Sequence, residues 1–179
     1  AGNMAEAIAR GAIEKGVLSA DQMIASDPSV ARKQVFESLG IKVVESNAEV
    51  IAQSGQVMLA IKPQVLPELA GELAEHGREG QVLISIMAGI GSAKIAEAVG
   101  RPARVVRVMP NTPMMVGLGM SGLAMGEHAQ AGDEALAMKL FGAAGEVVRV
   151  EEKLMDAVTA VSGSGPAYVY YLAEAMQQA

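Results

Sequence analysis

The chain has 179 residues, of which 51% are apolar and 19% are charged, and its 20 acidic and 14 basic residues give a formal net charge of −6. This composition predicts a folded chain with one good-sized core, because disorder requires low hydrophobicity and high net charge. The acidic balance and the lack of any run of Lys or Arg argue against a nucleic-acid partner, and the absence of cysteine excludes disulfides, Cys-ligated zinc and thiol nucleophiles.

Helices and strands are predicted to alternate over the first part of the chain. The stretch that begins "AGNMAEAIAR" has apolar residues at helical spacing up to Gly16, a residue typical of a helix end. The strands expected after it are "MIAS", "IKVV", "VMLAI", "VLISI" and "RVVRV", and the helices between them cover about 30–39, 47–53, 65–76 and 92–99. Strands this continuously apolar, with helices between them, predict an α/β fold with a parallel doubly wound sheet.

The pattern changes after residue 108, where "MPNTPMMVGLGMSGLAMG" predicts a loop followed by a strand. A helix near 131–144 and the strand "EVVRV" at 146–150 follow. From Glu151 the chain turns helical, with a break at "SGSGP" and a last helix from Pro166, because proline suits the first turn of a helix. We therefore expect an α/β domain over residues 1–150 and the start of a helical domain over residues 151–179.

Membrane and metal sites are not expected from the sequence. No stretch approaches the roughly eighteen uninterrupted apolar residues that a membrane-spanning helix needs, and the start does not have the pattern of a signal peptide. We therefore expect a cytoplasmic protein with no membrane partner. The two histidines, His76 and His128, lie among polar residues and glycines without a set of neighbouring ligands, so no metal site is predicted.

The opening turn "AGNMA" is similar to the latter part of the G-x-G-x-x-A pattern that holds a pyrophosphate, with Gly2 as the second glycine and Ala5 in the small third position. In that pattern, backbone N–H groups and a helix N-terminus bind the anion. The pattern is weak by itself, because a glycine followed three residues later by an alanine is common. The alternative is an N-terminus without function.

A dinucleotide site also needs a polar residue at the end of the second strand, about 20 residues farther along, to bind the adenosine ribose. Ser26 and Asp27 end the strand "MIAS" and fit that position. A carboxylate at Asp27 would accept hydrogen bonds from a 2′-hydroxyl and repel a 2′-phosphate, whereas Arg32 would favour the phosphate. The choice between NAD and NADP therefore stays open, and Ser26 or Asp27 can also cap the helix that begins near Ser29.

Two further strand ends, "AIKP" at 60–63 and "SIMAG" at 85–89, lie where ligands bind in open α/β sheets. Lys62 is either an ordinary solvated lysine or a residue that faces such a site. Together the strand ends predict a dinucleotide crevice better than any one of them does.

Two longer stretches, "RVMPNTPMMVGLGMSGL" at 107–123 and "DAVTAVSGSGPAYVYYLAEAM" at 156–176, together with "GNMA" and "AIKP", resemble the pyrroline-5-carboxylate reductases. The resemblance runs over essentially the whole chain and implies a Rossmann-type, mostly parallel sheet followed by an all-α dimerisation domain in a homodimer or larger homo-oligomer. It also implies an oxidoreductase in which hydride passes from NADPH, or from NADH, to the imine carbon of 1-pyrroline-5-carboxylate and gives L-proline, the final step of proline biosynthesis.

The resemblance implies cofactor-binding residues along one edge of the sheet. They are Ala1, Gly2, Asn3 and Met4 in the pyrophosphate loop, and Ser26, Asp27, Pro28 and Asn47 at the adenosine end. Toward the nicotinamide they are Ala60, Ile61, Lys62, Pro63, Ile86, Met87 and Ala88, with Asn111 and Thr112 in the loop beneath it. Relatives often have a serine or a basic residue where Asp27 stands, which leaves the usual NADPH preference open here.

Family members begin with a strand of the form "IGFIG" and continue beyond the last helix to a Ser-Pro-Gly-Gly-Thr-Thr stretch that holds the substrate, and the printed sequence contains neither. We therefore expect a fragment of a longer polypeptide, with the catalytic groups outside it, that binds cofactor poorly and turns nothing over by itself. Removing a central strand would leave unpaired backbone groups that cost about 1 to 3 kcal/mol each if buried, so such a sheet is not expected to survive. Ser162 and Ser164 in "SGSGP" are not assigned as nucleophiles, because imine reduction needs none and no base lies nearby.

Two alternatives remain. The first is another Rossmann reductase of the β-hydroxyacid dehydrogenase type, which shares the opening turn but has no reason to carry "MPNTP" together with "SGSGPAY". The second is a dinucleotide-binding module without activity.

Overall fold

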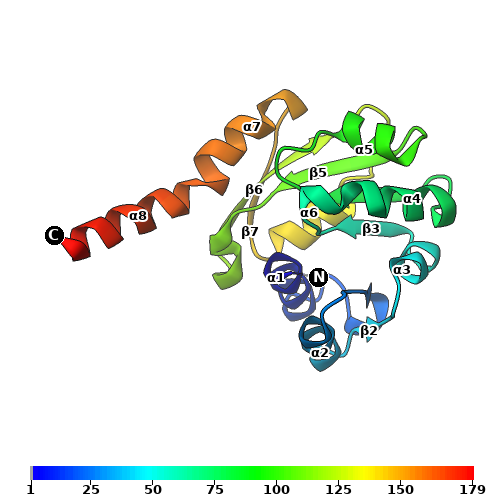
Figure 1. The fold of residues 1–179 in the computed structure, drawn as a ribbon, viewed down its shortest axis with the longest axis horizontal. Helices are drawn as coiled ribbons and strands as arrows, with labels where there is room; N and C mark the ends of the chain where they lie inside the picture. Colours follow the sequence, from blue (N-terminus) through cyan, green and yellow to red (C-terminus); the bar gives the residue numbers. More distant parts are fainter. Residues whose placement is uncertain (1) are drawn as a thin grey trace.

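The structure is a computed structural model that describes residues 2–179, and Figure 1 shows a sheet flanked by helices with one helix extending away from it. The extended helix is α8 (Gly165–Gln178), which leads to the C-terminus. None of its residues is buried. In residues 2–179, no helix combines the length and the apolar character that crossing a bilayer would require.

Helices and strands alternate much as predicted. The strands are β1 (Ile24–Ala25), β2 (Lys42–Val43), β3 (Gln56–Leu59), β4 (Val82–Ser85), β5 (Arg104–Met109), β6 (Gly119–Met125) and β7 (Gly145–Arg149). The other α-helices are α1 (Asn3–Glu14), α2 (Val30–Ser38), α3 (Asn47–Gln53), α4 (Leu66–His76), α5 (Ser92–Val99), α6 (Ala135–Gly142) and α7 (Met155–Val158). Short 3₁₀ helices are η1 (Ala20–Gln22), η2 (Pro63–Val65), η3 (Thr112–Val116) and η4 (Glu152–Leu154), and η5 (Thr159–Gly163) is a π-helix.

Local sequence signals explain where several helices begin and end. Gly16 and Gly40 follow α1 and α2 with φ of 65° and 79°, a left-handed conformation that glycine adopts at little cost. The Ser46 hydroxyl caps α3 by accepting a hydrogen bond from the Glu49 N–H at 3.2 Å. Pro166 lies in the first turn of α8, where its missing N–H costs no helical hydrogen bond.

The main sheet has the strand order β3-β4-β5-β6-β7. Strands β3, β4 and β5 are parallel, β6 is antiparallel to β5, and β7 is parallel to β6. The connection from β5 to β6 covers only residues 110–118, and a segment this short joins antiparallel strands, because a parallel crossover takes a dozen or more residues. The sheet is therefore mostly parallel.

Helices cover both faces of this sheet. One apolar core packs α1 and α6 against Val82, Ile84, Val106 and Val108, on one face of β4 and β5. The other core packs α3, α4 and α5 against the opposite face, which includes Leu83 and Val105. The alternation of these valines, isoleucines and leucines between faces explains why the strands are apolar throughout.

Strands β1 and β2 form a separate two-stranded parallel sheet. A cavity of about 410 Å³, mostly apolar, lies between β1 and β3 and is lined by both strands.

The C-terminal part differs from prediction at the "SGSGP" stretch. A break over residues 162–166 was expected there because glycine and serine favour turns, but the π-helix η5 continues to Gly163 and α8 begins at Gly165. The Ser164 N–H donates to the Thr159 carbonyl at 2.8 Å, which closes the wide turn. The predicted break of five residues was therefore too long, since only Ser164 separates the two helices.

Candidate functional site

The N-terminal end of α1 has the features of an anion-binding site. Gly2 is the residue that precedes the helix, its backbone is extended, and as a glycine it has no side chain with which to cap the first turn. A Cβ built at Gly2 would have no heavy atom within 4 Å, so there is open space in front of this turn. The first-turn N–H groups can therefore bind an anion, which the helix dipole also favours.

The carboxyl end of β1 is tied to the start of α3 by two side chains. The Ser26 hydroxyl donates to Asn47 Oδ1 at 2.7 Å, and Asn47 Nδ2 donates to Glu72 Oε1 at 3.1 Å. Asn47 is exposed and is the first residue of α3. The hydroxyl and amide groups at this position suit the hydroxyl groups of a ribose.

Two opposite charges lie near the carboxyl end of β1. Asp27 accepts a hydrogen bond from the Ser29 N–H at 2.8 Å. Arg32 forms an ion pair with Glu6 at 3.0 Å and donates to Asn3 Oδ1 at 3.4 Å. The ionised Asp27 and the guanidinium of Arg32 therefore both lie near the start of α1.

The ends of β3 and β4 present backbone as well as side chains. Lys62 is exposed and immediately precedes the short helix η2. Met87 is only 2% exposed and packs in the core, while its N–H donates to the Ser85 hydroxyl at 3.3 Å. Ala88 and Gly89 are exposed, and Gly89 has a φ of 70°. At this turn the backbone around Ala88, and not the side chain of Met87, is available to a ligand.

Asn111 joins the two longest stretches of the resemblance. Its Oδ1 accepts a hydrogen bond from the Met120 N–H at 2.9 Å, and its Nδ2 donates to the Ser162 hydroxyl at 3.2 Å. A Cβ at Gly163 would lie 2.7 Å from Met109 Cε, so the π-helix packs closely against the end of β5. The "MPNTP" and "SGSGP" segments, far apart in sequence, therefore meet at one place beside the sheet.

Residues 1–89 match the protein family described as NADP oxidoreductase coenzyme F420-dependent, and residues 152–179 match the family described as pyrroline-5-carboxylate reductase dimerisation. The pyrroline-5-carboxylate reductase of Arabidopsis thaliana is 41% identical over 177 residues, which are 98% of this chain and 64% of that protein. A structure of a pyrroline-5-carboxylate reductase from Coxiella burnetii is 32% identical, with a TM-score of 0.88 over 99% of this chain and 66% of that one. The chain belongs to the pyrroline-5-carboxylate reductase family.

A structure of the Plasmodium falciparum pyrroline carboxylate reductase has NADP bound, is 29% identical, and has a TM-score of 0.85 over 97% of this chain and 64% of that one. This chain thus spans less than two thirds of the length of the Arabidopsis and Plasmodium proteins. The family and the structure confirm the predicted fold class, a Rossmann-type mostly parallel sheet followed by a helical segment.

The structure brings some of the predicted site residues together and leaves others apart. Ser26, Asn47, Ala60 and Ile61 line the cavity between β1 and β3. The others follow strand ends or begin helices without lining that cavity: Gly2, Asn3, Met4, Asp27, Pro28, Lys62, Pro63, Ile86, Met87, Ala88, Asn111 and Thr112. Ala1 lies outside the described residues, so its predicted role stays a prediction.

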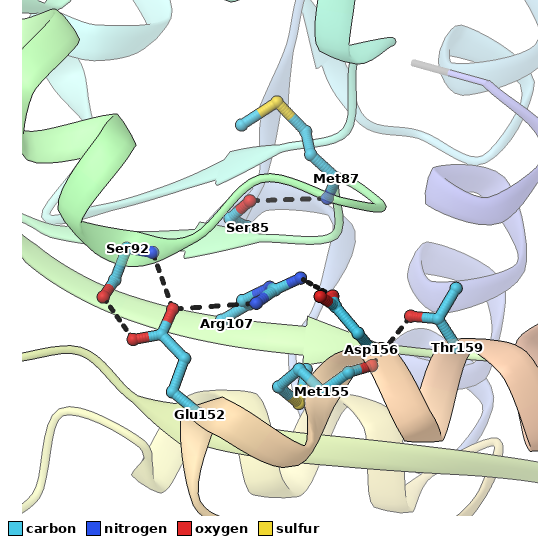
Figure 2. A network of polar contacts seen from close by, with 8 residues as sticks. All are labelled: Ser85, Met87, Ser92, Arg107, Glu152, Met155, Asp156 and Thr159. Carbon is cyan, nitrogen blue, oxygen red and sulfur yellow. Dashed lines mark hydrogen bonds and ion pairs between the residues drawn. The ribbon is translucent and has the colours of Figure 1, made fainter.

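One polar network was missed by the sequence analysis. Arg107 lies in β5 with its side chain 7% exposed, 3.8 Å from Glu152 and 3.4 Å from Asp156 (Figure 2). Glu152 also accepts hydrogen bonds from the Ser92 N–H at 2.6 Å and the Ser92 hydroxyl at 2.5 Å. The network therefore joins β5, the start of α5 and the start of the dimerisation segment. The charged residue inside the apolar stretch "RVVRV" was the sequence signal that could have pointed to it.

Proposed function

We propose that the protein reduces 1-pyrroline-5-carboxylate to L-proline with NADPH, the final step of proline biosynthesis, with NADH as the alternative cofactor. The observation that carries the proposal is the arrangement at one edge of the sheet. The glycine before α1, the Ser26–Asn47 pair and the joined "MPNTP" and "SGSGP" segments all lie after strand ends or at helix starts. Family membership supplies the substrate class.

The residues present fit a dinucleotide. The open space in front of Gly2 would take the pyrophosphate, held by the first-turn N–H groups of α1. Ser26 and Asn47 would hold the adenosine ribose, and the backbone around Ala88 would lie along the nicotinamide end. When bound, the nicotinamide would supply the hydride for the imine carbon.

The charges near the ribose set the choice between cofactors. Asp27 would accept hydrogen bonds from a 2′-hydroxyl and repel a 2′-phosphate, and Arg32 would attract that phosphate. Because Glu6 and Asn3 already hold Arg32 beside the pyrophosphate position, we propose NADPH as the preferred cofactor. The NADP-bound Plasmodium structure supports this preference.

Cofactor binding is tested with the substitution Gly2→Ala. The backbone at Gly2 has a φ of −78° and a Cβ there meets no protein atom, so the substitution should leave stability unchanged. It should weaken NADPH binding about tenfold, because the second glycine of the turn lets the backbone approach the pyrophosphate. Gly71→Ala in α4 is the matched control, since a Cβ at Gly71 also meets nothing within 4 Å. Equal NADPH affinity for the two variants would place the dinucleotide elsewhere.

Activity is tested by giving the protein NADPH and 1-pyrroline-5-carboxylate and measuring both the loss of NADPH and the formation of L-proline. The same assay with NADH gives the cofactor preference. NADPH binding without L-proline formation by the full-length polypeptide would instead favour a binding module without activity.

We also propose that the chain divides near Glu151 into a dinucleotide-binding domain and the start of a dimerisation domain that pairs two copies. Large apolar side chains of α8 are exposed, including Tyr168, Tyr171 and Met176 at 60%, 76% and 72%. A helix that exposes this much apolar surface needs a covering partner. Light scattering should show a dimer or larger homo-oligomer, and Tyr171→Glu should shift it toward the monomer. A wild-type monomer at micromolar concentration would contradict the proposal.

A further inference from the structure

A second cavity, of about 610 Å³, lies at the edge of the sheet opposite the strand ends described above. Most of its lining residues come from the turns that precede β4 and β5 and from the segment that follows β6, and Leu73, Leu83 and Val99 form its apolar part. These are the amino ends of the parallel strands, whereas the dinucleotide residues follow their carboxyl ends. The cavity is therefore separate from the proposed active site, and its volume is in the range of small-molecule sites.

Three arginines line this cavity. Arg104 is neutralised by the buried Asp133, to which its Nε donates at 2.9 Å, and it also donates to the Gly80 carbonyl. Arg78 and Arg101 instead donate to backbone carbonyls, of Ser54 at 2.6 Å and of Leu73 at 3.4 Å.

Within residues 2–179, Arg78 and Arg101 have no carboxylate within ion-pair distance, unlike the other arginines described. A protein with a net charge of −6 thus directs two unneutralised guanidinium groups, each with further N–H donors, at one cavity.

A buried acceptor lies on the same wall. Gln81 is 7% exposed and donates from Nε2 to the carbonyls of Ile51 and Ser54, at 2.8 and 2.7 Å, while its Oε1 has no hydrogen-bond partner among the described residues. A Cβ at Gly77 would lie 2.4 Å from Arg101 Nη2 and 3.3 Å from Gln81 Oε1, so donor and acceptor lie against the same glycine. A buried acceptor without a partner is costly unless a ligand or water donates to it.

We propose that this cavity binds a small amino acid, with its carboxylate against Arg78 and Arg101 and its ammonium group near Gln81 Oε1 and Glu79. Glu79 lines the cavity and adds a negative charge, which disfavours a polyanion such as a polyphosphate and favours a ligand with a cationic group. A zwitterion satisfies the guanidinium groups and the buried amide oxygen together, whereas a simple anion leaves Gln81 Oε1 without a donor and is repelled by Glu79.

Three probes with the same carbon skeleton test the proposal by calorimetric titration of the protein. L-Aspartate carries an ammonium group, L-malate a hydroxyl and succinate neither, so the affinity should fall in that order. Arg78→Gln and Arg101→Gln should each weaken L-aspartate binding about tenfold or more, because each removes hydrogen bonds to a charged group. Arg10→Gln removes the same charge from α1 and should leave the affinity unchanged.

Amide NMR signals of the unmodified protein locate the ligand even where a variant folds poorly. The signals of Gly80 and Gln81 should shift with L-aspartate, and those of Asn3 and Asn47 should not. Succinate binding as tightly as L-aspartate, a loss in Arg10→Gln equal to that in the two test variants, or shifts confined to Asn3 and Asn47 would overturn the proposal.

Discussion

The buried Arg107 and its partner Glu152 allow a prediction in which the two members of an ion pair respond differently to removal. We expect Glu152→Ala to destabilise the protein strongly and Arg107→Met to destabilise it little. The reason is that Glu152→Ala leaves a buried cation facing only the exposed Asp156, whereas Arg107→Met removes the charge together with its need for a partner (Figure 2).

The magnitude follows from the contacts of Glu152. It accepts two hydrogen bonds from Ser92 at the start of α5, and a hydrogen bond to a charged group contributes about 1.5 to 3 kcal/mol. Removing one partner of a buried ion pair costs about 3 to 5 kcal/mol of unfolding free energy, because the other charge stays buried without a partner. The Glu152 side chain is 28% exposed and lies 3.8 Å from Arg107, so the lower end applies. We expect a loss of about 3 kcal/mol for Glu152→Ala and at most about 1 kcal/mol for Arg107→Met.

The measurement is urea unfolding followed by circular dichroism, with the double variant included. The double variant should lose at least about 1 kcal/mol less unfolding free energy than the two single variants lose together, because it has no buried Arg107 cation without a partner. Glu151→Ala is the matched control, since Glu151 pairs only with exposed Lys153 at 2.6 Å and should change stability by less than about 0.5 kcal/mol. A cost for Arg107→Met as large as that for Glu152→Ala would refute the reasoning.

Three further predictions concern acid stability, close packing and cofactor choice. The hydrogen bond from Arg104 lowers the pKa of Asp133. The ionised Asp133 therefore stabilises the fold above the ordinary aspartate pKa of about 3.9, and this stabilisation is lost as the pH falls through the lowered pKa. In urea titrations, Asp133→Asn should destabilise the protein at neutral pH and destabilise it less below about pH 4. Gly122→Ala should cost about 1 to 3 kcal/mol in the same titrations, because its Cβ would meet Val158 of α7 at 2.8 Å. Gly163→Ala should cost less, because the one close contact of its Cβ is the flexible end of Met109, at 2.7 Å. Asp27→Ser should raise the preference for NADPH over NADH about tenfold in steady-state kinetics, since a carboxylate repels a 2′-phosphate; an unchanged preference would show that Asp27 lies away from the ribose.

The sequence predicted the elements that depend on local signals. The helices over 47–53 and 92–99 have the predicted bounds, because a serine or glycine precedes each and its apolar spacing is clear. The strand expected at 57–61 is Gln56–Leu59 instead, since its pairing is limited by the four residues of β4. The antiparallel direction of β6 could not be predicted from the hydrophobic pattern, because antiparallel and parallel strands have the same alternation of side chains.

The sequence predicted those candidate site residues that directly follow strands or begin helices. Ser26 and Asn47 were expected at the adenosine end and are joined there by a hydrogen bond, although their contact with a cofactor stays a prediction. The residues that hold this edge together were not predictable, because Glu72 and Glu152 act across 25 and 60 positions of sequence. The resemblance predicts Met87 at the cofactor site, but its side chain is buried in the core, so only its backbone lies at the end of β4.

The same long-range contacts connect the two parts of the chain. Asn111 donates a hydrogen bond to Ser162 beside the proposed nicotinamide end, and Arg107 and Ser92 hold Glu152 at the start of the dimerisation segment. The links come from β5, the loop after it and the start of α5, and α7 also packs against β6, so these contacts fix where α7 leaves the sheet (Figure 1). If α8 pairs with a second copy as we propose, the position of that copy relative to the nicotinamide end depends on these contacts. A substitution such as Glu152→Ala should then alter catalysis through the dimer without changing NADPH affinity, which separates its effect from that of Gly2→Ala.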